Sequence, residues 1–122
     1  MEVIRRNEVV VLANPGIASH QLPSPGNSAS PRLTITRNVL QPSTRHRHET
    51  WEQVWIALSG SGILLLAGHA TLPFAEGAVE RFAEGEIPGL HNAGRGTSEY
   101  LALTAPPLDF HAAHATRDQA AR

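Results

Sequence analysis

The sequence contains no cysteine and no lysine in 122 residues. The lack of cysteine excludes disulfide frameworks, zinc ribbons, iron–sulfur ligation and thiol nucleophiles. Because all ten positively charged residues are arginine, Schiff-base catalysis and the lysine of a phosphate-binding P-loop are excluded as well. Histidine, with seven copies, is therefore the residue type best suited to carry chemistry in this chain.

A long hydrophobic segment at the N-terminus and a strong net charge are also missing. The apolar run over residues 9–13 is too short for a signal sequence or a membrane span. A formal net charge of −1 provides no long-range field that would attract nucleic acid. We therefore expect a cytoplasmic protein of bacterial type with neither a nucleic-acid nor a membrane partner.

Short apolar runs separated by turn residues dominate what is present. Leu33, Ile35 and Val39 alternate with polar residues, which is typical of a strand with one buried face. Similar short strands are predicted at 9–13, 44–49, 53–58, 63–67, 70–74, 78–82 and 99–104. About eight to ten short strands without a helical stripe predict an all-β antiparallel sandwich or barrel.

The length suits a single domain over 1–122, with its core at about 33–104. Residues 1–31 are expected to form an N-terminal strand and a proline-rich loop. Residues 105–122 are expected to form a tail, whose alanine-rich part at 112–121 suits a short helix or a frayed end.

His46 and His48 form the most informative histidine pair. On a strand, residues two apart point to the same face, so the two imidazoles would lie side by side. Imidazole suits transition metals such as zinc, iron or nickel, and two parallel imidazoles supply half of a typical ligand set. The alternative is a pair of surface histidines among charged residues.

The sequence around this pair resembles the first motif of the cupin superfamily. After His46 and His48, the polar pair Glu52–Gln53 opens the next predicted strand, and Gly60 follows Gln53 at the spacing of the motif. The resemblance implies a double-stranded β-helix, or jelly roll. It also implies a divalent metal (Zn, Ni, Fe or Mn), for which the candidate ligands are His46, His48, Gln53 and His91, with Glu52 as an alternative to Gln53.

The second cupin motif is present in a degenerate form. Gly77, Gly85 and Asn92 occupy its positions, whereas Ala83 replaces a proline and Pro88 stands where the motif has a histidine. Proline has no side-chain atom that binds metal, so this set of ligands would hold an ion weakly. His91 could substitute only if the loop before it folds back, because strand parity puts 88 and 91 on opposite faces.

Three functions remain open on this basis. The first is a metal-dependent oxygenase, isomerase or lyase acting on a small organic substrate. The second is a non-enzymatic cupin that binds a small molecule and has lost its metal, and the third is a barrel that serves only structure or association. The residues predicted to line a ligand pocket are Trp55, Tyr100, Arg81 and Pro88.

A homodimer is the expected assembly. If Gln53 points into the barrel, then Val54, Ile56 and Leu58 face outward and need cover, because exposing a large apolar side chain costs about 1.5–3 kcal/mol. Related cupins commonly dimerise through such faces and through exchanged N-terminal strands, for which residues 8–12 are the candidate. The alternative is an N-terminal strand that packs on its own sheet.

Overall fold

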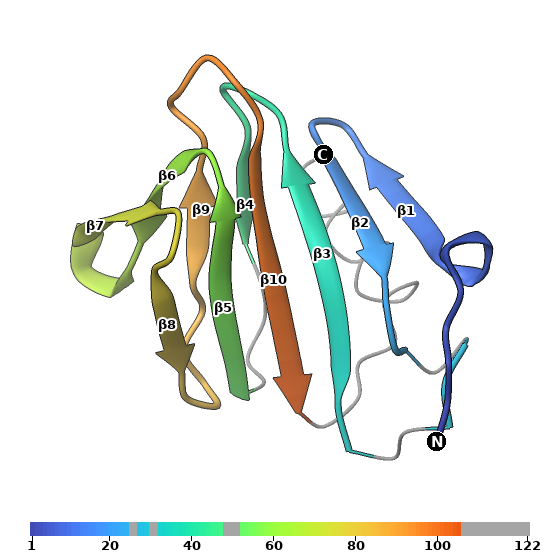
Figure 1. Cartoon of the computed structure of the whole chain (residues 1–122). Coiled ribbons are helices and arrows are strands. Elements are labelled where there is room, and N and C mark those ends of the chain that lie inside the picture. Colours follow the sequence, from blue (N-terminus) through green and yellow to red (C-terminus); the bar gives the residue numbers. More distant parts are fainter. Residues whose placement is uncertain (25–26, 30–31, 48–51, 106–122) are drawn as a thin grey trace.

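The computed structural model describes residues 1–24, 27–29, 32–47 and 52–105, and in this part the chain forms two antiparallel sheets that face one another (Figure 1). The larger sheet contains, in spatial order, β1 (Val10–Asn14), β2 (Ile17–Gln21), β3 (Thr34–Leu40), β10 (Ser98–Ala105), β5 (Glu52–Ser59) and β8 (Val79–Phe82). The smaller sheet contains β4 (Arg45–Arg47), β9 (Gly89–His91), β6 (Ser61–Leu65) and β7 (Thr71–Ala75).

Many neighbouring strands are far apart in sequence. In the larger sheet β10 lies between β3 and β5, and in the smaller sheet β9 lies between β4 and β6. The only helical segments in the described part are two short 3₁₀ turns, η1 (Arg6–Glu8) and η2 (Ala67–His69). The all-β prediction is therefore confirmed, and the strand order agrees with the jelly roll that the cupin resemblance implies.

Burial alternates along the central strands as the period of two predicts. On β5, Gln53, Trp55 and Ala57 are buried, whereas Val54 and Ile56 between them are only partly covered. The buried side chains of both sheets meet between the layers and form one core. Its apolar members are Ile17, Leu40, Trp55, Ala57, Leu64, Phe74, Phe82, Leu90, Tyr100 and Ala102.

Two strands are absent from the sequence-based prediction. β2 was missed because its buried positions include Ser19 and Gln21, so no apolar alternation marks it. β9 was missed because it is only three residues long and begins with glycine. In both cases pairing with neighbouring strands outweighs weak local β-propensity.

The N-terminal strand packs on its own sheet. β1 pairs with β2 in register from Val10–Gln21 to Asn14–Ile17. In this single chain the strand packs as the alternative prediction has it, and the exchange of residues 8–12 with a partner subunit stays a prediction. No helix in the described ranges is long and apolar enough to cross a membrane.

Asn92 ties three segments together at one end of the barrel. Its side-chain nitrogen donates to the carbonyl oxygens of Leu40 and Gly96, both at 2.9 Å, and its side-chain oxygen accepts from the backbone nitrogen of Gly94 at 3.0 Å. Its backbone also bonds to Ser43 and Thr44. This fully buried residue thus joins the end of β3, the turn before β4 and the loop from β9 to β10.

Candidate functional site

The inner face of the larger sheet is organised in rows of residues that lie directly opposite one another across the strands. One row runs Thr34, Thr104, Gln53, Phe82. The next row runs Gln21, Thr36, Ala102, Trp55, Glu80. A third row runs Ser19, Asn38, Tyr100, Ala57. Each row is polar at its β2–β3 end. Toward β5 the second and third rows become mainly apolar, whereas the first row stays polar through Gln53 and ends in Phe82 on β8.

The apolar half is an aromatic cluster centred on Trp55. The ring centroid of Trp55 lies 4.9 Å from that of Tyr100, 5.0 Å from that of Phe82 and 6.3 Å from that of Phe74. Trp55 and Tyr100 are both 0% exposed. The two residues predicted to form a pocket wall therefore pack against each other in the core, with geometry favourable for aromatic pairs.

Gln53 also faces the interior and is already hydrogen-bonded there. The indole nitrogen of Trp55 donates to its side-chain oxygen at 3.0 Å, and the side chain is 1% exposed. A metal ion at this oxygen would have to share it with the indole N–H. Gln53 thus has the orientation that the cupin resemblance implies, but its oxygen already serves the aromatic cluster.

His46 is the one described member of the predicted histidine pair. It lies at the centre of β4, is buried, and stands directly opposite Leu90 of the core. His48 lies outside the described residues. His46 therefore faces the interior, as the sequence predicts. The pairing of the two imidazoles stays a prediction.

His91 lies on the other face of the same sheet. Its cross-strand neighbour is the exposed Arg45, whereas its sequence neighbour Leu90 faces His46. The loop before β9 does not reverse this parity. His91 is therefore not brought to the same side as His46, which corrects its selection as a third imidazole ligand.

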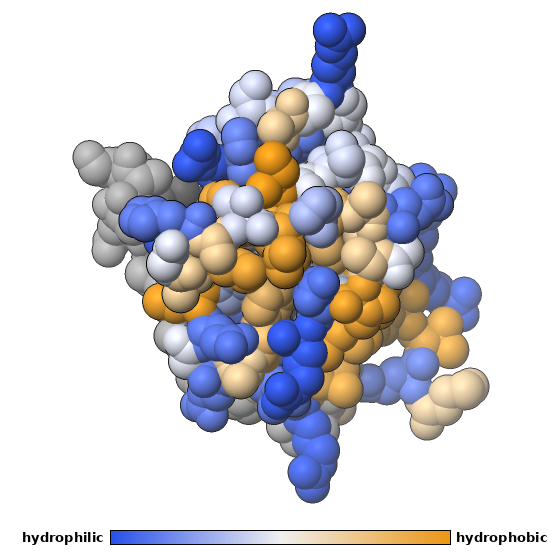
Figure 2. Space-filling model, turned by 90° about the vertical axis from the view of Figure 1, so that its left-hand side faces the viewer, coloured by the Kyte–Doolittle hydropathy of each residue, from blue (hydrophilic) through white to orange (hydrophobic). Residues whose placement is uncertain are grey.

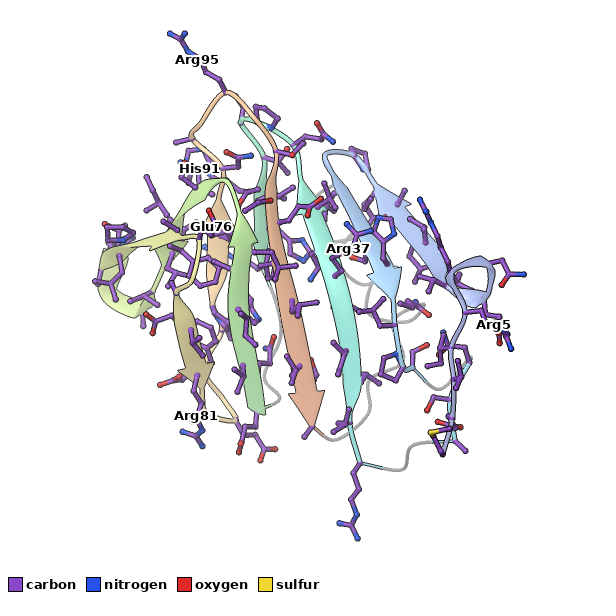
Figure 3. All side chains as sticks on the ribbon, viewed as in Figure 1. Arg5, Arg37, Glu76, Arg81, His91 and Arg95 are labelled. Carbon is purple, nitrogen blue, oxygen red and sulfur yellow. The ribbon has the colours of Figure 1, made fainter. Side chains whose placement is uncertain are left out.

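Glu52 and Arg81 point away from the interior, which corrects two further expectations. Arg81 lies opposite the outward-facing Val54, and its guanidinium is 3.4 Å from the Glu52 carboxylate. Figure 3 shows the Arg81 side chain extending away from the sheets. Both side chains are more than half exposed, so Glu52 does not replace Gln53 and Arg81 does not line the interior. Glu80, the other charged residue of β8, lies on the inner face of the strand instead.

Pro88 is buried one residue before β9. Because Pro88 lies two positions before Leu90, its side chain points to the same face as that of Leu90, and His46 occupies this face as well. Among the residues that the structure describes, no three histidine, aspartate or glutamate side chains form a group that could hold a metal ion. Among the described residues, the inward-facing candidate donors are the His46 imidazole and the shared amide oxygen of Gln53, and these two alone do not fit a tightly bound divalent ion.

Sequence reasoning overlooked the polar end of the rows, here called the polar strip: Ser19 and Gln21 of β2 with Thr34, Thr36 and Asn38 of β3. Within the described part of the chain, three buried atoms of the strip lack a hydrogen-bond partner: Gln21 Nε2, Thr34 Oγ1 and Asn38 Oδ1. The sequence carries a signal for this strip, because polar residues occupy every second position at 34–38 and also positions 19 and 21.

Comparisons with known proteins agree with this architecture. No family model matches the sequence, and no curated protein matches it. Ectoine synthase from P. lautus superposes with a TM-score of 0.77 at 16% identity, covering 95% of this chain and 86% of that one. The polyketide cyclase RemF from Streptomyces resistomycificus gives a TM-score of 0.71 at 21% identity over 88% and 82% of the two chains.

A third structure carries the superfamily name directly. A Cupin 2 conserved barrel domain protein from Salinispora arenicola CNS-205 gives a TM-score of 0.68 at 21% identity, covering 84% of this chain and 87% of that one. At these identities the likeness concerns the fold. The chain therefore has the double-stranded β-helix fold that these structures share.

Proposed function

We propose that this cupin barrel binds a small organic molecule between its two sheets, without a tightly held metal ion. The observation that carries the proposal is the polarity of the interior. In the described part of the chain, eleven buried residues are polar or charged, against ten hydrophobic residues and the buried Pro88. Burying an uncompensated polar group costs about 1–3 kcal/mol, so a barrel that served only structure would be expected to enclose apolar side chains. A polar interior is suited to a polar guest.

Structural neighbours support the same class of function at a coarse level. Two proteins with this fold are named as enzymes, a synthase of ectoine and a cyclase of polyketides. Because one fold hosts many chemistries, this likeness supports a ligand inside the barrel rather than a particular reaction.

A metal-dependent oxygenase, isomerase or lyase is the second candidate, and the inward orientation of His46 favours it. The described side chains offer no anionic ligand beside that imidazole, because Glu52 faces outward, and the proline at position 88 takes the place of the motif's further imidazole. Two imidazoles and a neutral amide would leave the charge of a zinc, nickel, iron or manganese ion uncompensated. Weak metal binding is therefore the expected result.

Metal analysis and ligand screening separate these candidates. Protein purified without an affinity tag should contain less than about a tenth of an equivalent of any transition metal, because tight structural sites retain their ions. Soaking with zinc, nickel, iron or manganese should leave its melting temperature unchanged. The His46→Ala and His48→Ala double variant serves as the matched control. Stoichiometric metal that this variant loses would support the metal-dependent alternative instead.

The ligand itself is tested on the metal-free protein by thermal shift with a library of neutral, anionic and cationic metabolites. A ligand that binds only the folded state raises the melting temperature in a concentration-dependent manner. A library in which no organic compound stabilises the protein, combined with saturable stabilisation by metal, would contradict the proposal.

We also propose that the chain forms a homodimer through the outer face of the larger sheet. Ile35, Leu103 and Val54 lie in one outward row, and Leu101 and Ile56 lie side by side in the next. Val79 of β8 extends this second row beside Ile56 and is exposed, and Figure 2 shows hydrophobic residues gathered between hydrophilic ones on the flank that carries β8. Sedimentation equilibrium should give twice the mass of the chain, and Leu101→Arg should give the monomer. A wild-type monomer would contradict this assembly.

A further inference from the structure

A single row of outward-facing residues crosses all six strands of the larger sheet. In order from β1 to β8, the row contains Val11, His20, Arg37, Leu101, Ile56 and Val79. Four of these residues are apolar, and two of the four, Leu101 and Ile56, belong to the proposed dimer interface. The other two, His20 and Arg37, carry or can gain a positive charge. His20 therefore lies on the same surface as the apolar residues that a second copy would cover.

The spacing along this row places His20 inside an interface of ordinary size. Neighbouring strands are about 4.8 Å apart, so His20 lies about 10 Å from Leu101, with Arg37 between them. A stable complex of standard size covers about 800 Å² on each partner, which corresponds to a disc of about 16 Å radius. An interface centred on Leu101 therefore covers Arg37 and His20 as well.

The charged groups next to His20 are one arginine and the carboxylate that pairs with it. Across the strands, His20 lies beside Val11 of β1 and Arg37 of β3. The Arg37 guanidinium is 3.3 Å from the Glu99 carboxylate of β10, and the two side chains are 34% and 31% exposed. The flanking same-face residues of the paired strands are apolar: Ala13, Ala18, Ile35 and Val39. With a neutral His20, this part of the face carries no net charge, because Arg37 and Glu99 balance each other.

Protonation of His20 disturbs this balance. An imidazolium would lie beside the Arg37 guanidinium, so that two cations would share one carboxylate, that of Glu99. Burial and the positive charge of Arg37 already lower the pKa of His20 in the single chain, and Glu99 opposes the effect. A second copy on this face would remove further water from the imidazole and lower its pKa more. Because burying a charge without a partner of its own is strongly unfavourable, the second copy and the proton compete for this surface.

We propose that the homodimer is controlled by pH: two subunits associate through their outer faces when His20 is neutral, and they separate when it is protonated. This inference rests on the proposed homodimer, since it names a regulation of that interface. In a dimer with two-fold symmetry both copies contribute the same face. Each dimer therefore contains two copies of His20, and its dissociation takes up to two protons.

The dissociation constant should depend on pH on the acidic side only. Well above pH 6.5 the imidazole is neutral in the separate subunit and in the dimer, so association releases no proton. Below the subunit pKa of His20, which lies under 6.5, the separate subunits bind protons that the dimer excludes, so the dissociation constant rises as the pH falls. Two linked protons give a rise of up to about 100-fold for each pH unit.

Sedimentation equilibrium of the full chain over a range of concentrations measures this constant. It should rise at least about tenfold between about pH 7.5 and about pH 5.5, because the protonated subunits are favoured at the lower value. Near-UV circular dichroism at the same pH values monitors the folding of the subunit. Its signal should be retained while the dimer dissociates.

Two histidine variants assign the effect. His20→Gln replaces the imidazole by a polar group that does not titrate, so this variant should dimerise with a dissociation constant that is the same at both pH values. His69→Gln makes the same change at an exposed position of η2 in the other sheet's hairpin, and it should keep the pH dependence of the wild type.

Each contrary outcome overturns a different statement. A wild-type monomer at about pH 7.5 contradicts the homodimer itself, whereas a dissociation constant that is equal at both pH values overturns the pH control and leaves the homodimer intact. Acid dissociation that persists in His20→Gln assigns the effect to another group. A His20→Gln monomer at about pH 7.5 makes His20 a required contact of the interface instead of its switch. Dissociation that coincides with loss of the near-UV signal is acid unfolding, and it overturns the proposal as well.

Discussion

The indole nitrogen of Trp55 donates a 3.0 Å hydrogen bond to the side-chain oxygen of Gln53, two residues earlier on the inner face of β5. The bond lies where the polar and aromatic halves of the interior meet, because Gln53 stands opposite Thr104 and Trp55 packs against Tyr100. In the cupin resemblance the Gln53 position belongs to a metal centre. In this chain the same oxygen anchors the largest side chain of the core.

Replacing either partner should therefore destabilise the fold through a shared interaction. Gln53→Leu removes the acceptor of a buried N–H group and should cost about 1–3 kcal/mol. Trp55→Phe removes the donor together with part of the packing. The double variant should cost less than the sum of the two, with a coupling of about 0.5–3 kcal/mol measured by urea unfolding. Gln41→Leu, at an exposed glutamine, is the control, and additive effects of the two core changes would contradict the coupling.

Pro88→His should raise the affinity for metal above that of the wild type. Position 88 is buried, and it shares the parity of Leu90, which stands opposite His46. An imidazole there would join His46 on one face, and imidazole is a strong ligand for zinc and nickel. We expect the affinity for nickel to rise by about tenfold or more, since each added ligand contributes strongly to a transition-metal site.

Ile87→His, at an exposed neighbouring position, is the matched control and should bind nickel like the wild type. Equilibrium dialysis measures both variants. An unchanged affinity in Pro88→His would mean that the loss of the motif histidine is not what weakens the site.

The sequence predicts the architecture well because burial on one face imposes alternation, as β3 and β5 show. It also predicts the inward orientation of His46 and Gln53, since strand parity follows from the cupin spacing. It fails where the inner face is polar. Because Ser19 and Gln21 occupy buried positions of β2, the sequence shows no apolar alternation that would predict this strand. The partnerless atoms of the strip can be recognised only once β2 is known to lie beside β3. The outward orientation of Glu52 and Arg81 likewise depends on the register of β5 with β8.

Asn92→Ala should be one of the most destabilising single changes at the end of the barrel. It removes three side-chain hydrogen bonds and leaves the carbonyl groups of Leu40 and Gly96 and the N–H of Gly94 without their present partner. The bond to Leu40 is buried, whereas those to Gly96 and Gly94 are only partly buried, so at about 1–3 kcal/mol for a buried group left unpaired the loss should be about 2 kcal/mol. Urea unfolding measures it, with the exposed Asn7→Ala as control. A change no larger than that of the control would show that the clamp is dispensable.

His20 should make the stability depend on pH. It lies opposite Arg37, whose guanidinium is 3.3 Å from the Glu99 carboxylate. Burial lowers the pKa of His20 below 6.5, the positive charge of Arg37 lowers it further, and Glu99 opposes the effect. The unfolded chain therefore binds a proton at this residue more readily than the folded chain, so stability falls as the pH drops from 6.5 toward the lower folded-state pKa.

Two variants test the origin of this pH dependence. His20→Gln should flatten the dependence of the unfolding free energy on pH, because the titrating group is gone. Arg37→Gln should reduce it, because the folded-state pKa of His20 then moves back toward 6.5. Urea unfolding at several pH values measures the stability, and the His20 ring proton shifts in NMR report its pKa directly. A His20 pKa above 6.5 in the folded protein would reverse the predicted slope and contradict this account.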